Sequence, residues 1–257
     1  MPILSIPIGR RVFAPSWKMT ALTVALCVLF LYLGRWQWDK GIRRQAEWDE
    51  FARGADRAVV LGSRDVMELT RFQHVEVAGR YDPSRQFLLD DLIHNGEAGY
   101  EVLTPLKLDD GRVLLVNRGW IPFSGYENRL PDVRLTVTAP VTLTGRVDEL
   151  PAAGLSLGRM PPPPGNRWPK VTSFPDMGQL GAALGLRLGS QLERRIVLLD
   201  PTAKFGYVRD WQPPGMEPLR NLAYAIQWWA FAATLIIIWA ILSAPRPKPL
   251  QPAGGAR

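Results

Sequence analysis

Two uncharged apolar segments, one near each end of the chain, constrain its fold more than any other feature. The longer covers residues 221–245 and would span about 37 Å as a helix, more than the roughly 30 Å of hydrocarbon in a bilayer. The shorter covers residues 19–34 and would span about 24 Å, with Trp17 and Trp36 placed where tryptophans settle at membrane interfaces. The sequence therefore predicts one membrane-spanning helix near each end.

The net charge of +7 is concentrated outside these spans. The two flanking tails contain no acidic residue and six basic ones, namely Arg10, Arg11, Lys18, Arg246, Lys248 and Arg257. Without these six the chain has 25 basic and 24 acidic residues, so no basic surface remains to bind nucleic acid. Basic residues that flank a span favour the cytoplasmic side. We therefore expect both termini in the cytoplasm and the middle of the chain in the periplasm, outside a bacterial inner membrane.

The first apolar segment is interpreted as an anchor, because residues 33–38 lack the small-x-small pattern of a signal-peptide cleavage site. The predicted fold is a membrane protein in which two transmembrane α-helices flank one β-rich α+β domain outside the cytoplasm. The expected segments are a cytoplasmic tail (1–18), a transmembrane helix (19–38), a periplasmic β-rich domain (39–219), a second transmembrane helix (220–244) and a cytoplasmic tail (245–257).

Hydrophobic patterns predict that the middle of the chain is mostly β-structure. The turn Asp109-Asp110-Gly111 separates two apolar runs, 100–108 and 112–121, which is a typical hairpin signal. The proline-rich stretch 151–169 is expected to form a long loop. Further strands are expected at 72–81, 86–89, 135–147 and 194–199, and helices at 39–55 and 176–186.

The chain offers little for catalysis or metal binding. It has two histidines, His74 in an alternating strand and His94 in an expected turn, and neither has a second histidine or a cysteine nearby in sequence. It contains no phosphate-binding glycine loop and no nucleophile elbow, and its single cysteine, Cys27, lies within the first span. We therefore expect no catalytic residue and no metal site, and an extracytoplasmic enzyme is the disfavoured interpretation.

The start of the second span contains polar residues that an apolar helix does not need. Arg220, Tyr224 and Gln227 are spaced four and three apart and therefore share a helical face, with Trp228 beside them. An amide inside a span is costly unless it meets a partner. Gln227 should therefore bond either the first span or a ligand or partner helix. On the first span, Ala21 and Ala25 form a small-xxx-small pair that would allow close approach.

An ordered set of short motifs resembles a known family. The runs LGRWQ (33–37), VNRGWIP (116–122) and YAIQW (224–228), with shorter matches at 79–81, 88–90 and 99–102, are similar to segments of the Surfeit locus protein 1 family. The resemblance covers nearly the whole chain. It is carried above all by Gly34, Trp36, Gln37, Arg118, Gly119, Trp120 and Pro122.

The resemblance implies an assembly factor, not a catalyst, for the heme–copper cytochrome c oxidase, which helps heme a delivery or insertion into subunit I. The implied partners are subunit I, other oxidase assembly factors and the lipid bilayer. Where family members are proposed to bind heme, a histidine begins the second span; here Asn221 takes its place, and an amide is a poor iron ligand. Transient heme a or a partner is expected to contact Arg220, Tyr224, Gln227 and Trp228. The alternative is a cofactor-free membrane-anchored protein that stabilises an oxidase subunit.

Overall fold

The structure is a computed structural model, and it describes residues 6–8, 11–54, 58–125, 129–137, 139–151, 160–213 and 215–244. The chain divides into two compact units. One comprises residues 1–47 and 214–257, and the other comprises residues 48–213. Each unit is described separately below.

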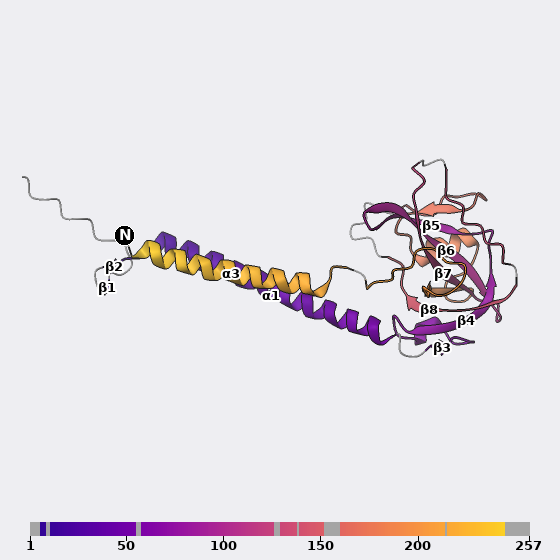
Figure 1. Cartoon of the computed structure of the whole chain (residues 1–257), viewed down its shortest axis with the longest axis horizontal. Helices are drawn as coiled ribbons and strands as arrows, with labels where there is room; N and C mark the ends of the chain where they lie inside the picture. The colour runs from indigo at the N-terminus through magenta and orange to yellow at the C-terminus, as the bar shows by residue number, and fades with distance from the viewer. Residues whose placement is uncertain are drawn as a thin grey trace, which may run out of the picture. The chain divides into compact units, whose positions relative to one another are not determined.

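The first unit is built on two long helices that lie side by side (Figure 1). Helix α1 runs over Trp17–Arg53 and continues into the second unit, and helix α3 runs over Pro218–Ser243. A small hairpin of β1 (Ile6–Ile8) and β2 (Arg11–Phe13) precedes α1. Both helices are long and apolar enough to cross a membrane, and few residues of their apolar stretches are buried. By length and composition, the two helices near the ends of the chain thus match the two predicted membrane spans.

A seam of residues spaced seven apart holds α1 against α3. A Cβ added at Gly34 would lie 2.3 Å from Trp229 Nε1, and one added at Gly41 would lie 2.8 Å from Leu222 Cδ2. Cys27 Sγ lies 3.8 Å from the Ala232 carbonyl oxygen. The heptad spacing of Thr20, Cys27, Gly34 and Gly41 is typical of closely packed helix pairs.

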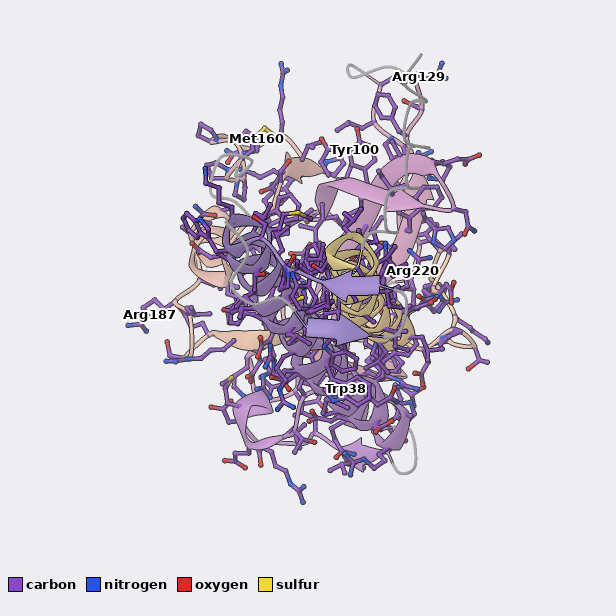
Figure 2. All side chains as sticks on the ribbon, turned by 90° about the vertical axis from the view of Figure 1, so that its left-hand side faces the viewer. Trp38, Tyr100, Arg129, Met160, Arg187 and Arg220 are labelled. Carbon is purple, nitrogen blue, oxygen red and sulfur yellow. The ribbon has the colours of Figure 1, made fainter. Side chains whose placement is uncertain are left out.

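The predicted small-xxx-small contact on the first span is wrong. Ala21 and Ala25 are exposed, because they lie on a different face of α1 from the glycine seam. Aromatic side chains fill the seam where the glycines do not. Trp239 Nε1 donates to Thr20 Oγ1 at 3.1 Å, and Trp38, labelled in Figure 2, packs on Trp229 with ring centroids 5.7 Å apart.

The second unit is a curved eight-stranded sheet (Figure 1). In spatial order its strands are β3 (Val59–Val60), β4 (His74–Tyr81), β8 (Val141–Asp148), β10 (Leu192–Leu199), β7 (Val113–Pro122), β6 (Glu97–Leu108), β5 (Phe87–His94) and β9 (Lys170–Thr172). The end of β4 also pairs with β6, so β4, β8, β10, β7 and β6 form a closed ring. Strands β7 and β10 are parallel, and their neighbours in the ring are antiparallel.

Alternation along the strands divides the apolar residues between two faces. One set, including Val77, Leu106 and Val116, forms a buried cluster that the ring encloses. The opposite face of β6, β7 and β10 packs against α2 (Met177–Leu184) through a second cluster that includes Leu115, Leu180 and Ile196. A short 3-10 helix, η1 (Val66–Glu68), lies between β3 and β4 in the sequence.

Several predicted elements are present with altered bounds. The predicted hairpin is β6–β7, and the predicted helix is α2, which Asp176 caps through a capping box. The strand expected at 86–89 continues to His94, so His94 ends a strand instead of lying in a turn. The strand expected at 135–147 begins only at Val141. Part of the predicted long loop, residues 152–159, lies outside the described residues.

Candidate functional site

Three of the predicted contact residues share an exposed face of α3. Arg220, Tyr224 and Gln227 are all exposed, as their helical spacing predicts, and Arg220 is labelled in Figure 2. Phe231 continues this face one turn further and is also exposed. Trp228 lies at its edge and packs on Phe30 of α1, with ring centroids 5.6 Å apart. We call Arg220, Tyr224, Gln227 and Phe231 the outer face of α3.

The exposure of Gln227 bears on the two alternatives left by the sequence. A hydrogen bond from Gln227 to the first span would require its side chain to face α1, but the face of α3 that packs on α1 carries the buried residues Asn221, Ala225 and Ala232. Gln227 therefore presents its amide away from the helix pair. A hydrogen bond from Gln227 to the first span, one of the two alternatives, is therefore not seen among the described residues.

Two other amides face the interface between α1 and α3. Asn221 is 2% exposed, and a Cβ added at Gly41 would lie 3.4 Å from Asn221 Cβ. Among the residues that the structure describes, Asn221 Nδ2 and Gln37 Oε1 are buried and accept or donate no hydrogen bond. These two unsatisfied polar atoms weaken the helix pair relative to apolar side chains of similar size.

These residues do not fit the axial ligation of a heme iron. Asn221 supplies an amide, and it is enclosed between the two helices. Arg220 and Tyr224 lie on the exposed outer face, whereas Asn221 lies on the buried one. Asn221, at the position of the implied iron ligand, thus lies on a different face of α3 from Arg220 and Tyr224, which were expected to contact heme a or a partner.

The other motif residues of α1 also have distinct places. Gly34 belongs to the seam with Trp229, and Gln37 is the buried amide described above. Trp36 is exposed, and the Lys40 ammonium lies 5.1 Å from its ring centroid. This placement agrees with a tryptophan and a lysine at a membrane interface.

Arg118, at the centre of the β7 motif, is buried and links separate segments of the chain through hydrogen bonds. Its Nε donates to the Phe205 carbonyl oxygen at 2.7 Å, and its Nη1 donates to Gln86 Oε1 at 2.8 Å. Its guanidinium also lies 4.9 Å from the ring centroid of Tyr207. Burial lowers the pKa of this guanidinium. Arg118 therefore holds the turn after β10 and the chain before β5 against β7, which is a structural role.

Gly119 forms a bulge that turns the next side chain. Glu101 pairs with Trp120 and Leu103 with Asn117, so β7 has one more residue than β6 across this step. Gly119 has φ +107°, and a Cβ there would lie 2.5 Å from the Val208 carbonyl oxygen. The Asn117 side chain spans the bulge, accepting from Gly119 N at 3.1 Å and donating to Glu101 Oε2 at 2.6 Å.

The bulge directs Trp120 across the sheet. A Cβ at Gly99 would lie 2.4 Å from Trp120 Cε2, so the indole lies over a position that only glycine permits. Trp120 Nε1 donates to the Leu92 carbonyl oxygen at 3.4 Å. His94 packs beside the indole with ring centroids 5.2 Å apart. Pro122 ends β7 and is exposed, beyond this arrangement.

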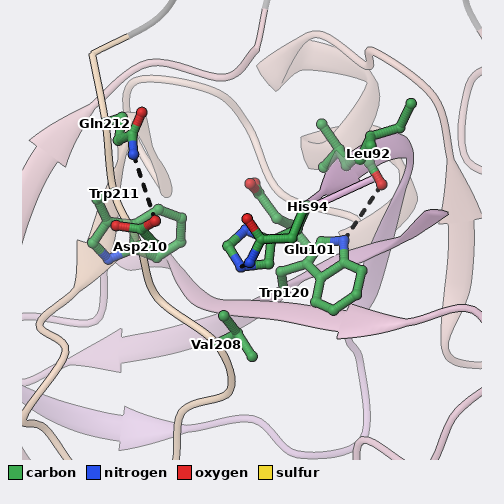
Figure 3. Close-up of a pocket in the computed structure, with 10 residues that line it drawn as sticks. Leu92, His94, Glu101, Trp120, Val208, Asp210, Trp211 and Gln212 are labelled. Carbon is green, nitrogen blue, oxygen red and sulfur yellow. Dashed lines mark hydrogen bonds between the residues drawn. The ribbon is translucent and has the colours of Figure 1, made fainter. Parts of the chain in front are cut away.

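These residues form one wall of a cavity of about 360 Å³ (Figure 3). His94, Glu101 and Trp120 lie together, and Asp210, Trp211 and Gln212 lie on the facing side (Figure 3). Burial raises the pKa of the Glu101 carboxyl, and the hydrogen bond from Asn117 opposes that rise. The cavity lining thus combines aromatic faces with carboxylates, and the described residues that form it include no lysine or arginine.

His74, in strand β4, pairs with a carboxylate from another segment of the chain. Its Nε2 lies 2.6 Å from Asp200 Oδ2, and both side chains are largely buried. This pair joins β4 to the turn after β10, so His74 has a structural role. Among the described residues, no group of histidine, cysteine and carboxylate side chains is arranged to hold a metal ion.

The sequence motif singled out Trp120 but did not reveal that its side chain lines a cavity. It gave no indication of the cavity itself. The β-bulge and the bridge between Trp120 and Val208 bring the two walls of the cavity together from residues far apart in the chain. The motif NRGW was the available signal for one wall. No comparable sequence signal marks Asp210 or Trp211.

Comparison with known proteins gives one consistent result. A sequence model of the SURF1 family matches residues 24–233. An uncharacterized SURF1-like protein of Mycobacterium tuberculosis is 29% identical over 229 residues, which cover 84% of this chain and 79% of the relative. A SURF1-like protein of Rickettsia bellii is 24% identical over 239 residues, which cover 86% of this chain and 90% of the relative.

Proposed function

The chain belongs to the SURF1 family, whose members are in general oxidase assembly factors, and we propose that it assists assembly of the heme–copper cytochrome c oxidase by docking to subunit I. In this proposal the protein lies in a bacterial inner membrane with both termini in the cytoplasm. Its β-rich unit then lies in the periplasm. The basic tails and the two apolar helices support this orientation.

The outer face of α3 is the observation that carries the proposal. Gln227 lies in an apolar helix and is exposed away from α1, where lipid alone cannot satisfy its amide. Tyr224 and Arg220 extend the polar part of the face toward the start of the helix. A transmembrane helix of subunit I with polar side chains at the same depth would satisfy these groups.

The proposal assigns this chain no iron ligand, because the residues around Asn221 do not fit one. Its contribution to heme a insertion is then to stabilise subunit I while it receives the cofactor, as a membrane-anchored chaperone rather than a carrier or a catalyst. Other oxidase assembly factors remain potential partners of the same complex in this proposal.

Site-specific photocrosslinking tests the docking face. We expect p-benzoylphenylalanine at Gln227 to crosslink to subunit I in membranes of cells assembling the oxidase. The same group at Ile226 is the matched control, because Ile226 is exposed at nearly the same depth but about 100° around the helix. Equal crosslinking to subunit I from both positions, or none from Gln227, would contradict the proposed face.

A further inference from the structure

The cavity beside Trp120 carries an inference that goes beyond the proposed function and does not depend on it. Its volume of about 360 Å³ lies at the small end of the range of about 300–1,000 Å³ that is usual for ligand sites. Residues of the sequence motifs shape the cavity, because Gly119 forms a bulge in β7 and Gly99 leaves room for the Trp120 indole. Functional sites are common next to such bulges.

The lining favours a cation. Trp120, Trp211 and His94 supply aromatic faces, and Glu101 and Asp210 supply carboxylates. Among the described residues, Glu101 accepts from Asn117 through Oε2 alone, and Asp210 accepts one long bond of 3.5 Å from Gln212. Arg118, two residues before Trp120, and Arg209, next to Asp210, donate to carbonyl oxygens elsewhere.

Arginine matches this combination better than lysine. Its planar guanidinium can stack on an indole and donate to carboxylates through several N–H groups at once. The charge of the lining therefore argues for an arginine side chain and against an anionic ligand.

An unpaired strand edge adjoins the cavity. Strand β9 pairs with Phe87–Leu89 of β5 and reaches no further along that strand. Among the described residues, no strand pairs with residues 90–94 on the side away from β6. Leu92, Ile93 and His94 of this stretch line the cavity, and Ile93 is 75% exposed. An open edge of this kind can pair with an added strand.

We propose that the cavity and the free edge of β5 together bind an extended polypeptide segment of a partner, whose arginine side chain enters between Trp120 and Trp211. Main-chain hydrogen bonds along residues 90–94 supply affinity. The aromatic and carboxylate lining supplies selectivity for the cationic side chain.

The test uses the full chain in nanodiscs of zwitterionic lipid, so that a cationic peptide is not attracted to the membrane surface. The protein is labelled with 5-fluorotryptophan, and the Trp120 resonance is assigned with Trp120→Phe. The probe is acetyl-Thr-Val-Arg-Val-Thr-amide, and its control carries citrulline, a neutral isostere, in place of arginine. We expect the Trp120 resonance to shift on titration, with the citrulline peptide at least about tenfold weaker.

Variants and two further probes make the outcome decisive. Glu101→Gln and Asp210→Asn should each reduce the preference for arginine over citrulline, while Glu76→Gln, an exposed carboxylate of β4 outside the cavity, should leave it unchanged. Equal affinity for both peptides overturns the proposal, as does an arginine preference that survives both cavity substitutions. A peptide with N-methylated valines should bind more weakly. If agmatine binds as tightly as the peptide, edge pairing is overturned and the cavity accepts a small free guanidinium compound.

Discussion

At the scale of single residues, four consecutive positions of one motif have four different tasks. Asn117 spans a bulge, Arg118 ties distant segments to the strand, Gly119 supplies a positive φ, and Trp120 forms a cavity wall. Such a division explains why the sequence could single out these residues but not their roles. Each role depends on a partner that is remote in sequence, such as Val208 or Phe205.

Gly119→Ala should destabilise the β-rich unit strongly. The substitution combines strain at φ +107° with a Cβ placed 2.5 Å from the Val208 carbonyl oxygen, and we expect a loss of about 2–5 kcal/mol. Gly111→Ala is the control, because Gly111 has φ +88° but open space around its Cβ, and it should cost only about 1–2 kcal/mol. Denaturant unfolding of the two variants measures the difference, and equal losses would refute the close-contact explanation.

Glu101→Gln should stabilise the protein at neutral pH. Burial raises the pKa of Glu101, so the folded state binds its proton more tightly than the unfolded state does. Protonation of Glu101 therefore contributes to the free energy of unfolding of the wild type. This contribution is fully present below the ordinary pKa of the carboxyl and is lost as the pH rises through the folded-state pKa. Glutamine keeps an oxygen for the Asn117 amide but carries no charge.

The measurement is the difference in melting temperature between Glu101→Gln and wild type at pH 4 and at pH 7.5. We expect the difference to increase with pH in favour of the variant. A difference that is constant or decreases with pH would show that the buried charge is not the cause. The same substitution should weaken arginine binding. Glu101 would then lower the stability of the fold while it serves binding.

At the scale of elements, the two terminal helices were predictable but their packing was not. Length and lack of charge identify a span, but an apolar helix in lipid has no amphipathic stripe to reveal its buried face. The choice of Ala21 and Ala25 therefore failed, while the seam uses Gly34 and Gly41 because Trp229 and Leu222 need the space. Polar residues indicated which face of the helix is exposed only for the outer face of α3.

The seam predicts a specific disulfide. Ala232→Cys should crosslink to the native Cys27 on mild oxidation, because Cys27 Sγ lies 3.8 Å from the Ala232 carbonyl oxygen. Cleavage within the β-rich unit followed by a non-reducing gel would show the two helices held together. Adding Gly34→Leu should reduce the yield, since the larger side chain displaces Trp229.

Ala230→Cys is the matched control for this crosslink. Ala230 lies on an exposed face of α3, two residues from the buried Ala232, and should give no disulfide with Cys27 within one chain. Comparable yields at positions 230 and 232 would mean that the helices do not pack through the seam described here.

At the scale of the whole molecule, the order of parts along the chain, a long helix near each end and a β-rich unit between them, could be predicted from hydropathy and charge. The strand order did not, because ring closure depends on the second pairing of β4 with β6 and on the parallel pairing of β7 with β10. Local patterns specify strands and hairpins, but parallel partners separated by a long connection leave no signature in a single sequence. The cavity was hidden for the same reason.

Membranes from a respiring bacterium that lacks the gene for this chain provide the most direct test of its role in oxidase assembly. We predict that cytochrome c oxidase activity and subunit I fall together while heme a synthesis continues, and that the wild-type chain restores both. Gln227→Leu, which leaves the helix seam intact, should restore them poorly if the outer face of α3 docks to subunit I. Unchanged oxidase activity in the deletion strain would contradict the account.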